Sequence, residues 1–263
     1  LIKILNDENI RFPNTIFDRN ELFSSKKYLI KKIGGTGGDH VFYEASQSSI
    51  DVSSDNNFYY QEYIKGTVYS VVFLANGKTA NLIGFNRLLR SKQFIDLPFL
   101  YEGAISVNIN NQKILDDIRY VVNKITKKIK LFGLCGIDFI IDNNSSLFIV
   151  DVNPRPPSTF ELHESQQSLF LAHINCFNYA SIDYSRDKHN LLKGHIIYYA
   201  SKDLLFPENL NWPTWVKDRP YGKQKICIKN PICTIHAEGV SEEEVENTLK
   251  NRFKKIELFV KSI

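Results

Sequence analysis

The sequence of 263 residues contains no methionine, not even at its first position. From this absence we expect that the chain is not a complete translation product and that a segment precedes it. No apolar run approaches the ~18 residues that a membrane-spanning helix needs, and the N-terminus lacks the hydrophobic region of a signal peptide. We therefore expect a protein that has no membrane partner.

Cysteine and net charge are also scarce. The four cysteines form no Cys-x-x-Cys pair and no metal-ligand spacing, so we expect reduced thiols in a cytoplasmic protein. The 33 basic and 29 acidic residues leave a net charge of +4, which is too small to predict a nucleic-acid partner. The 43% hydrophobic and 24% charged content is that of a globular chain and excludes a disordered or collagen-like protein.

Hydrophobic periodicity divides the chain into strand-rich and helical parts. Four segments rich in β-branched and aromatic residues are predicted to be strands: 28–33, 40–45, 58–74 and 79–85. The spacing of Ile and Val predicts a helix over 111–131, and Ser241 with Glu244 forms a capping box that begins a second helix. Residues 46–57 and 181–193 are polar and are predicted to be a loop and a linker. Strand pairs that alternate with single long helices predict an α+β fold.

A glycine-rich loop connects the first two predicted strands. Residues 34–38 are Gly-Gly-Thr-Gly-Gly, and Lys31 comes just before them at the end of a strand. Glycines expose backbone N–H groups to phosphates, so the hairpin could act as a flap over a nucleotide. No Gly-Lys-Ser/Thr follows, and the next element is a strand, which excludes a Walker A loop and a dinucleotide fingerprint. A plain flexible hairpin with a solvated lysine remains an equally good interpretation.

Two aspartates are predicted to face each other across a second hairpin. A turn at 143–146 that pairs Asp142 with Leu147 places Asp138 directly across from Asp151. Cross-strand neighbours lie about 5 Å apart, so the two carboxylates would repel each other unless a cation lay between them.

The side chain of Asn153 shares the face of Asp151 because side chains alternate along a strand, and Arg155 follows just past the strand end. Two carboxylates and an amide oxygen suit Mg²⁺, which is usually shared with substrate phosphates. An exposed hairpin whose aspartates point into water is the alternative. The opposite face is predicted to be apolar: Ile137, Phe139, Ile141, Val150 and Val152.

A third, weaker motif is the segment 60–66, Tyr-Gln-Glu-Tyr-Ile-Lys-Gly, which suits a hinge whose backbone contacts an adenine edge. The order of lysine and glycine hairpin, this segment, Gly-x-Asp-Phe and Asp-Val-Asn-Pro-Arg resembles the ATP-grasp superfamily. Within it the chain looks like predicted ATP-dependent carboligases related to biotin carboxylase. The resemblance covers roughly residues 10–175, and residues 230–239 look like the C-terminal segment of the same group.

The resemblance implies two α+β lobes that clamp ATP. It implies a nucleotide site formed by Lys31, Gly35, Gly37, Gly38, Gln61, Glu62, Tyr63 and Ile64. It also implies that the metal ligands are Asp138, Asp151 and Asn153. Lys31 and Arg155 are the implied catalytic residues: Lys31 as a ligand of phosphate, and Arg155 as the group that holds the transferred phosphate or the acyl phosphate.

Three departures from the family pattern affect what it implies. Both metal carboxylates are aspartates where many relatives have a glutamate, and Val68 stands where several relatives have a ribose-binding glutamate. The family usually carries a further N-terminal domain, which helps to form the acceptor pocket and which this chain lacks. We expect a small lobe at 1–63, a large lobe with the magnesium site at 64–180, and a C-terminal extension at 194–263 that packs on the large lobe.

The resemblance implies an ATP-dependent ligase that activates a carboxylate as an acyl phosphate for attack by an amine, with Mg²⁺ or Mn²⁺ as the metal. Its partners would be a small-molecule carboxylate and an amine, and a homodimer is a candidate assembly. The alternatives are a biotin-carboxylase-like carboxylase, a kinase-like enzyme, and a non-catalytic ATP-binding module.

Five further residues have two interpretations each. Arg87, Arg90 and Lys92 follow a predicted strand and could contact the γ-phosphate, although a solvated basic run fits better. Glu161 and His163 could contact the acceptor, although a structural role fits at least as well.

Overall fold

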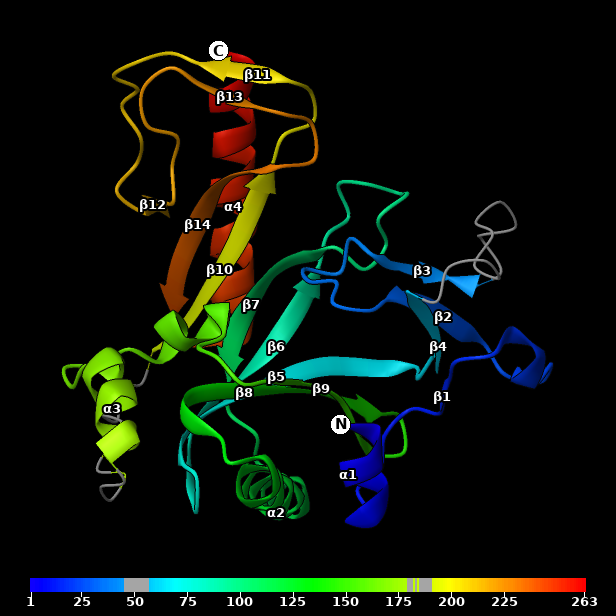
Figure 1. Ribbon diagram of the computed structural model, residues 1–263. Coiled ribbons are helices and arrows are strands. Elements are labelled where there is room, and N and C mark those ends of the chain that lie inside the picture. The colour runs from blue at the N-terminus through cyan, green and yellow to red at the C-terminus, as the bar shows by residue number, and fades with distance from the viewer. Residues whose placement is uncertain (45–56, 179–181, 183, 185–190) are drawn as a thin grey trace.

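The computed structural model describes residues 1–44, 57–178, 182, 184 and 191–263. The loop predicted at 46–57 and the linker predicted at 181–193 lie mostly outside the described residues. The fold combines antiparallel sheets with helices, which confirms the α+β prediction (Figure 1). No helix among the described residues is both long and apolar enough to cross a membrane.

The smaller sheet has four antiparallel strands in the order β1-β4-β2-β3. The strands are β1 (Thr15–Ile16), β2 (Tyr28–Lys32), β3 (Val41–Tyr43) and β4 (Phe58–Glu62), and a short 3-10 helix, η1 (Arg19–Glu21), follows β1. Its core is made by apolar side chains from three of these strands: Ile16, Tyr28, Ile30 and Tyr60. Because β2 and β3 pair directly, with Lys31 opposite Val41, the glycine loop between them is the hairpin predicted from the sequence.

The larger sheet has eight strands in the order β12-β14-β10-β7-β6-β5-β8-β9. Its strands are β5 (Gly66–Asn76), β6 (Ala80–Arg90), β7 (Tyr101–Val107), β8 (Phe132–Asp142), β9 (Leu147–Asn153), β10 (Leu192–Tyr199), β12 (Val216–Lys217) and β14 (Pro231–Gly239). The extended stretch predicted over 58–74 is divided between β4 and β5, which belong to different sheets, and the chain passes from one to the other within the predicted hinge at 60–66. At the start of β5, Gly66 approaches the backbone of Ile141 so closely that an added Cβ would lie 2.3 Å from its carbonyl oxygen.

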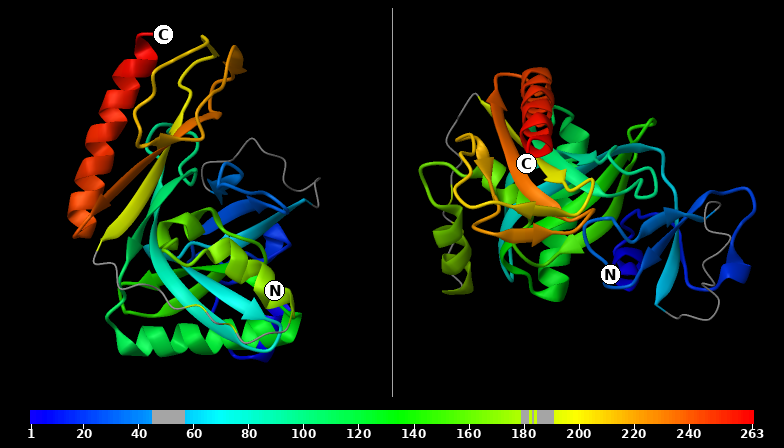
Figure 2. Two further views of the ribbon diagram at one scale, coloured as in Figure 1. Left: turned by 90° about the vertical axis from the view of Figure 1, so that its left-hand side faces the viewer. Right: turned by 90° about the horizontal axis from the view of Figure 1, so that it is seen from above.

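Helices cover both halves of the larger sheet (Figures 1 and 2). They are α1 (Ile2–Asp7), α2 (Gln112–Ile129), α3 (Leu169–Asn175) and α4 (Glu242–Lys261), with two further 3-10 helices, η4 (Ser158–His163) and η5 (Cys176–Asn178). The predicted helix at 111–131 is therefore confirmed, with Asn111 as its N-cap. The side chains of Leu5 and Ile10 lie in the same apolar core as α2, so the N-terminal segment packs on the larger sheet.

The tail of the chain continues the larger sheet. β10 pairs with β7 on one side and with β14 on the other, and α4 packs over them with Val245 and Leu249 in their core. The short strands β11 (Leu204–Phe206) and β13 (Gln224–Ile226) form a separate two-stranded antiparallel sheet. Half of the capping box predicted at Ser241 is confirmed, because its hydroxyl accepts from the Glu244 N–H at 3.2 Å. The Glu244 carboxylate accepts from the Val240 N–H at 2.8 Å and not from that of Ser241. The lobe boundaries expected from the sequence stay a prediction.

A β-bulge sets the register of the hairpin β8–β9. Ile141 pairs with Leu147 at its closed end, one residue away from the predicted pairing of Asp142 with Leu147. The register shifts between Phe139 and Asp138, so Asp138 still pairs with Asp151 as predicted. The shift also turns the side chain at position 150: Val150, which was predicted on the opposite apolar face, lines the cleft between the two sheets, and that prediction is wrong.

Candidate active site

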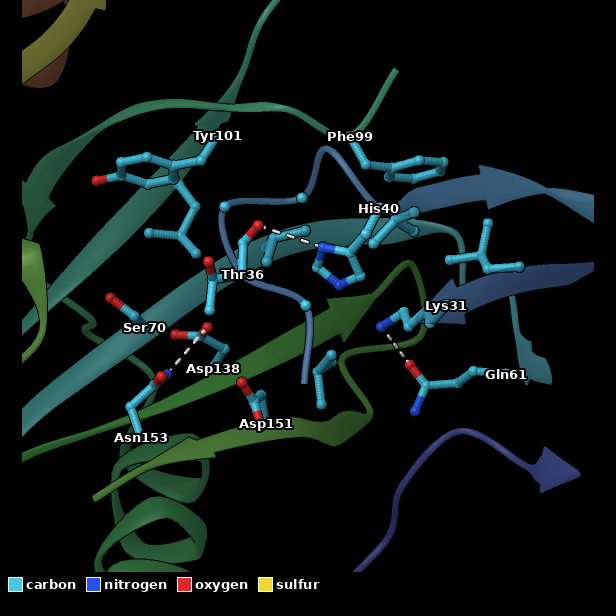
Figure 3. Close-up of a pocket in the computed structure, with 18 of the residues that line it drawn as sticks. Lys31, Thr36, His40, Gln61, Ser70, Phe99, Tyr101, Asp138, Asp151 and Asn153 are labelled. Atoms are coloured by element: carbon cyan, nitrogen blue, oxygen red, sulfur yellow. Dashed lines mark hydrogen bonds between the residues drawn. The ribbon is translucent and has the colours of Figure 1, made fainter. Parts of the chain in front are cut away.

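A cleft of about 560 Å³ lies where the smaller sheet faces the larger one, under the glycine hairpin (Figure 3). It collects side chains and backbone from both sheets. The residues predicted from the sequence to form the nucleotide, metal and catalytic sites all line it: Lys31, Gly35, Gly37, Gly38, Gln61, Glu62, Tyr63, Ile64, Asp138, Asp151, Asn153 and Arg155. The structure therefore brings together residues that are more than 120 positions apart in the sequence.

Lys31 lies near the end of β2 and lines the cleft from the side of the smaller sheet (Figure 3). Its Nζ donates to Gln61 Oε1 at 2.6 Å, and Gln61 Nε2 donates in turn to Thr15 Oγ1 at 3.3 Å. Burial lowers the pKa of Lys31 to about 8, although the nearby carboxylates of Asp151 and Asp138 favour its charged form. The ammonium therefore stays mostly charged at neutral pH and is held in one position by the Gln61 amide. This lysine–glutamine contact was not predicted from the sequence.

The glycine hairpin is docked against the start of β7. The Tyr101 N–H donates to Gly37 O at 2.8 Å. Gly38 has a positive φ of 79°, and an added Cβ would lie 2.0 Å from Phe99 O, so only glycine fits there. His40 Nδ1 contacts Thr36 O at 3.2 Å within the loop. The hairpin is thus held over the cleft by backbone contacts.

Asp138 and Asp151 lie side by side across β8 and β9 (Figure 3). Burial, together with the neighbouring charge of Asp151, raises the pKa of Asp138 to about 7, against the effects of Asn153, Arg155 and Lys31. Burial also raises the pKa of Asp151, although the Val152 N–H donates to its carboxylate at 2.8 Å. Two carboxylates are thus held in an arrangement that opposes their joint ionisation.

This pair fits a magnesium ion by the chemistry of its donors. Asn153 shares the face, and its Nδ2 lies 3.5 Å from Asp138 Oδ2. A divalent cation would offset the burial that raises the pKa of both aspartates and the charge of Asp151 that adds to it at Asp138. Mg²⁺ commonly takes one or two carboxylates together with substrate phosphates. Among the described residues no group of three His, Cys, Asp or Glu side chains could hold a metal, so the donor set does not suit a structural zinc site.

The segment that joins the two sheets forms the remaining wall. Glu62 is held by Lys26, whose Nζ donates to Glu62 Oε2 at 2.9 Å, while Tyr63 and Ile64 connect β4 to β5. Val68, at the position where the resemblance left the ribose contact open, also lines the cleft. The wall therefore offers backbone groups and apolar surface, with one paired carboxylate.

The arginines predicted near the site divide between two faces of the sheet. Arg87 lies within β6 and forms ion pairs with Glu242 and Glu246 of α4, at 3.1 and 2.9 Å, so a contact with phosphate is wrong for this residue. Arg90 lines the cleft, with its guanidinium 4.9 Å from the centre of the Phe99 ring. Arg155 also lines the cleft, where its charge favours the ionised form of Asp138.

A set of polar residues lies between the cleft and the C-terminal strands, and the sequence analysis either did not predict its members or left their role open. The Tyr101 hydroxyl lies 2.8 Å from His195 Nε2, and His195 Nδ1 lies 2.7 Å from Glu161 Oε1. The other candidate, His163, is buried and contacts Asn86 Oδ1 at 2.9 Å. No local pattern could have revealed these contacts, because β7, η4 and β10 meet only in the folded sheet.

The comparisons with known proteins agree with this architecture. A solved L-amino acid ligase from Bacillus licheniformis superposes with a TM-score of 0.70 at 11% identity, covering 95% of this chain and 68% of that one. The biotin carboxylase domain of a Hydrogenobacter thermophilus 2-oxoglutarate carboxylase, solved with MgADP, ADP and bicarbonate, gives a TM-score of 0.73 at 10% identity, covering 95% and 63%. At these identities the likeness concerns the fold.

Sequence comparison adds a curated relative. The tyramine–L-glutamate ligase of Methanocaldococcus jannaschii is 33% identical over 138 residues, which cover 52% of this chain and 38% of that protein. The chain spans about half the length, or less, of the curated relatives it matches. The protein-family model described as the ATP-grasp domain matches residues 1–159 of this chain. A match over more than half of the chain, on a fold with a nucleotide-sized cleft between its two sheets, shows that the protein belongs to the ATP-grasp family.

Proposed function

We propose that the protein is an ATP-dependent carboxylate–amine ligase. The observation that carries this proposal is the content of the cleft between the two sheets. A half-buried lysine and a glycine hairpin come from the smaller sheet, and a pair of aspartates with an arginine comes from the larger one. A positive group on one side and a metal-binding pair on the other suit a polyphosphate held between them.

Each group has a distinct part in binding MgATP. Lys31 would donate a charge-assisted hydrogen bond to a phosphate oxygen, with the Gln61 amide fixing its direction. The backbone N–H groups of the glycine hairpin would face the phosphates from above. Asp138 and Asp151 would hold Mg²⁺, which neutralises phosphate charge when bound.

The chemistry asks little covalent work of the protein. A substrate carboxylate oxygen attacks the γ-phosphorus and ADP leaves, which gives an acyl phosphate. The amine then attacks the acyl carbon and phosphate leaves. Lys31 and Arg155 hold the transferred group, so the rate gain comes from orientation and charge neutralisation.

The names of the relatives suggest where to look for the substrates. One curated relative joins tyramine to L-glutamate, and one solved neighbour is an L-amino acid ligase. We therefore propose an amino-acid carboxylate and a primary amine as the substrate classes. Because ATP is required and the four cysteines are free thiols, we place the protein in the cytoplasm as part of the same proposal.

The test is ADP release in the presence of Mg²⁺ and ATP against a panel of carboxylates and amines. The carboxylates are the twenty L-amino acids, with L-glutamate first, and the amines include tyramine and ammonia. We expect ADP release, with an amide product by mass spectrometry, only when both substrates are present.

Three outcomes would contradict the ligase. Turnover with bicarbonate alone would indicate a carboxylase, and phosphorylation of a hydroxyl compound would indicate a kinase-like enzyme. Nucleotide binding without turnover on any pair would indicate a non-catalytic module.

A further inference from the structure

A chain of three polar side chains leads from the cleft toward the tail half of the sheet. Tyr101, on β7, lines the cleft, and its hydroxyl lies 2.8 Å from His195 Nε2 on β10. His195 Nδ1 lies 2.7 Å from Glu161 Oε1 on η4, and the histidine itself is only 2% exposed. Figure 3 shows Tyr101 on the side of the cleft that also holds Asp138 and Asn153.

The chemistry of the partners determines where the protons lie. An ionised carboxylate only accepts hydrogen bonds, so the short contact to Glu161 requires the proton of His195 on Nδ1. The Nε2 of the neutral imidazole is then an acceptor, and the Tyr101 hydroxyl must be its donor. The phenolic oxygen keeps its own lone pairs, which can accept a further hydrogen bond.

The position of Tyr101 is fixed from several sides. Its N–H donates to Gly37 O of the glycine hairpin at 2.8 Å, and its carbonyl accepts from the Tyr199 hydroxyl at 2.6 Å. Ser158 Oγ lies 3.5 Å from the Tyr101 hydroxyl. Tyr101 therefore contacts the glycine hairpin through its backbone N–H and carries the phenol on its side chain.

The charges around this chain favour transfer of a proton away from the cleft. Burial raises the pKa of Tyr101 well above its ordinary value, so the phenol is neutral. Burial alone would raise the pKa of Glu161, but the hydrogen bond from His195 and the nearby His236 and Lys217 lower it overall. His236 Nε2 lies 3.8 Å from the same carboxylate, and burial lowers its pKa, so it does not replace His195 as the partner of Glu161.

We propose that Tyr101 and His195 take the proton from the ammonium form of the amine substrate, with Glu161 as a positioning residue. The inference rests on the ligase function proposed above. The ammonium N–H gives its proton to the phenolic oxygen as the phenol passes its own proton to His195 Nε2. The result is a neutral amine, an unchanged phenol and an imidazolium paired with Glu161. The amine lone pair is then free to attack the acyl phosphate.

Hydroxylamine separates this role from a structural one. It is a weak base that is largely neutral at neutral pH, so it captures an acyl phosphate as a hydroxamate without the help of a general base. The experiment compares hydroxamate formation with amide formation, using the carboxylate and amine that the ADP-release panel identifies. The variants are Tyr101→Phe and His195→Gln, whose amide can accept from the phenol but cannot take its proton.

The expected result is a split between the two nucleophiles. Amide formation should fall by about 100-fold or more in both variants, since general base catalysis is commonly worth 10²–10⁴. Hydroxamate formation should stay within about threefold of wild type. The lost amide rate should recover as the pH rises, because solvent then supplies the free amine. Tyr69→Phe is the matched control: this tyrosine stacks on Phe139 in the core beside α2, away from the cleft.

Two results would overturn the relay while leaving the ligase intact: equal loss of hydroxamate and amide, or no loss of either. MgADP affinity and thermal melts show whether a variant is folded, and the His195 variant tests the relay if Tyr101→Phe does not fold. Failure of the wild-type protein to form any hydroxamate would overturn the ligase proposal itself, and the relay with it.

Discussion

The paired aspartates predict that the metal-free protein is destabilised by its own active site. Asp138→Asn removes the carboxylate whose pKa is raised from 3.8 to about 7. A raised pKa means that the folded state holds the proton more tightly than the unfolded state, so stability is lost as the pH rises from about 4 to 7. Each pKa unit corresponds to about 1.4 kcal/mol, which gives a deficit of about 1–2 kcal/mol at pH 5 and about 4 kcal/mol above pH 7.

Asparagine should recover part of this deficit, about 2 kcal/mol at pH 8, because its amide must still be buried. For a chain of this size that corresponds to a rise in Tm of roughly 4–8 °C. The assay is thermal unfolding in EDTA between pH 5 and pH 8.5. Asp117→Asn is the control, since Asp117 forms an exposed ion pair with Lys113 at 3.3 Å and such pairs contribute little.

The gain from Asp138→Asn should be larger at pH 8 than at pH 5 and should disappear or reverse when Mg²⁺ and ADP are added, because only the wild-type protein gains the full metal site. A variant that melts below wild type at pH 8 without metal would refute the reasoning. So would a difference in Tm that is the same at pH 5 and pH 8.

Two further predictions concern single charged groups, one in the cleft and one outside it. Lys31→Ala should weaken MgATP binding by about ten- to a hundredfold, as expected for a lost charge-assisted hydrogen bond. Calorimetry measures the affinity, with Lys27→Ala, at an exposed lysine just before β2, as the control; equal affinities of Lys31→Ala and wild type would contradict the role of Lys31. Glu102→Gln should stabilise the protein by about 1–2 kcal/mol at pH 8 and much less at pH 5. Burial raises the pKa of Glu102 to about 6, so its charged form is unfavourable above that pH. A difference in the free energy of unfolding that is the same at both pH values would contradict this prediction.

Local patterns predicted the parts of the site that lie within one hairpin. The Lys31 and glycine hairpin needs only two adjacent strands, and the pairing of Asp138 with Asp151 needs only a short turn. The second pairing was predicted with a register that is one residue off at the turn, and the bulge at Val150 compensates for the difference. A bulge inserts a residue without a distinct sequence signal, which is why the side chain of Val150 was placed on the wrong face.

Contacts between distant segments were beyond prediction from one sequence. Tyr101, His195 and Glu161 come from three elements that meet only because β10 pairs with β7. The ion pairs of Arg87 depend on the docking of α4, which no local pattern specifies. The stretch over 58–74 is rich in strand-forming residues throughout, so strand propensity alone does not place the passage from β4 to β5, and the hinge motif at 60–66 was the signal that marked it.

The central claim is that Asp138 and Asp151 hold the magnesium ion that makes the γ-phosphate reactive. Its most direct test is the kcat for ADP release of Asp151→Asn, measured beside the Kd for ATP on the same preparation. The account predicts a fall in kcat of about 100-fold or more with a much smaller change in Kd, because Lys31 and the connection between the sheets still bind the nucleotide. Near-normal turnover in Asp151→Asn would contradict the account and make the aspartate pair structural.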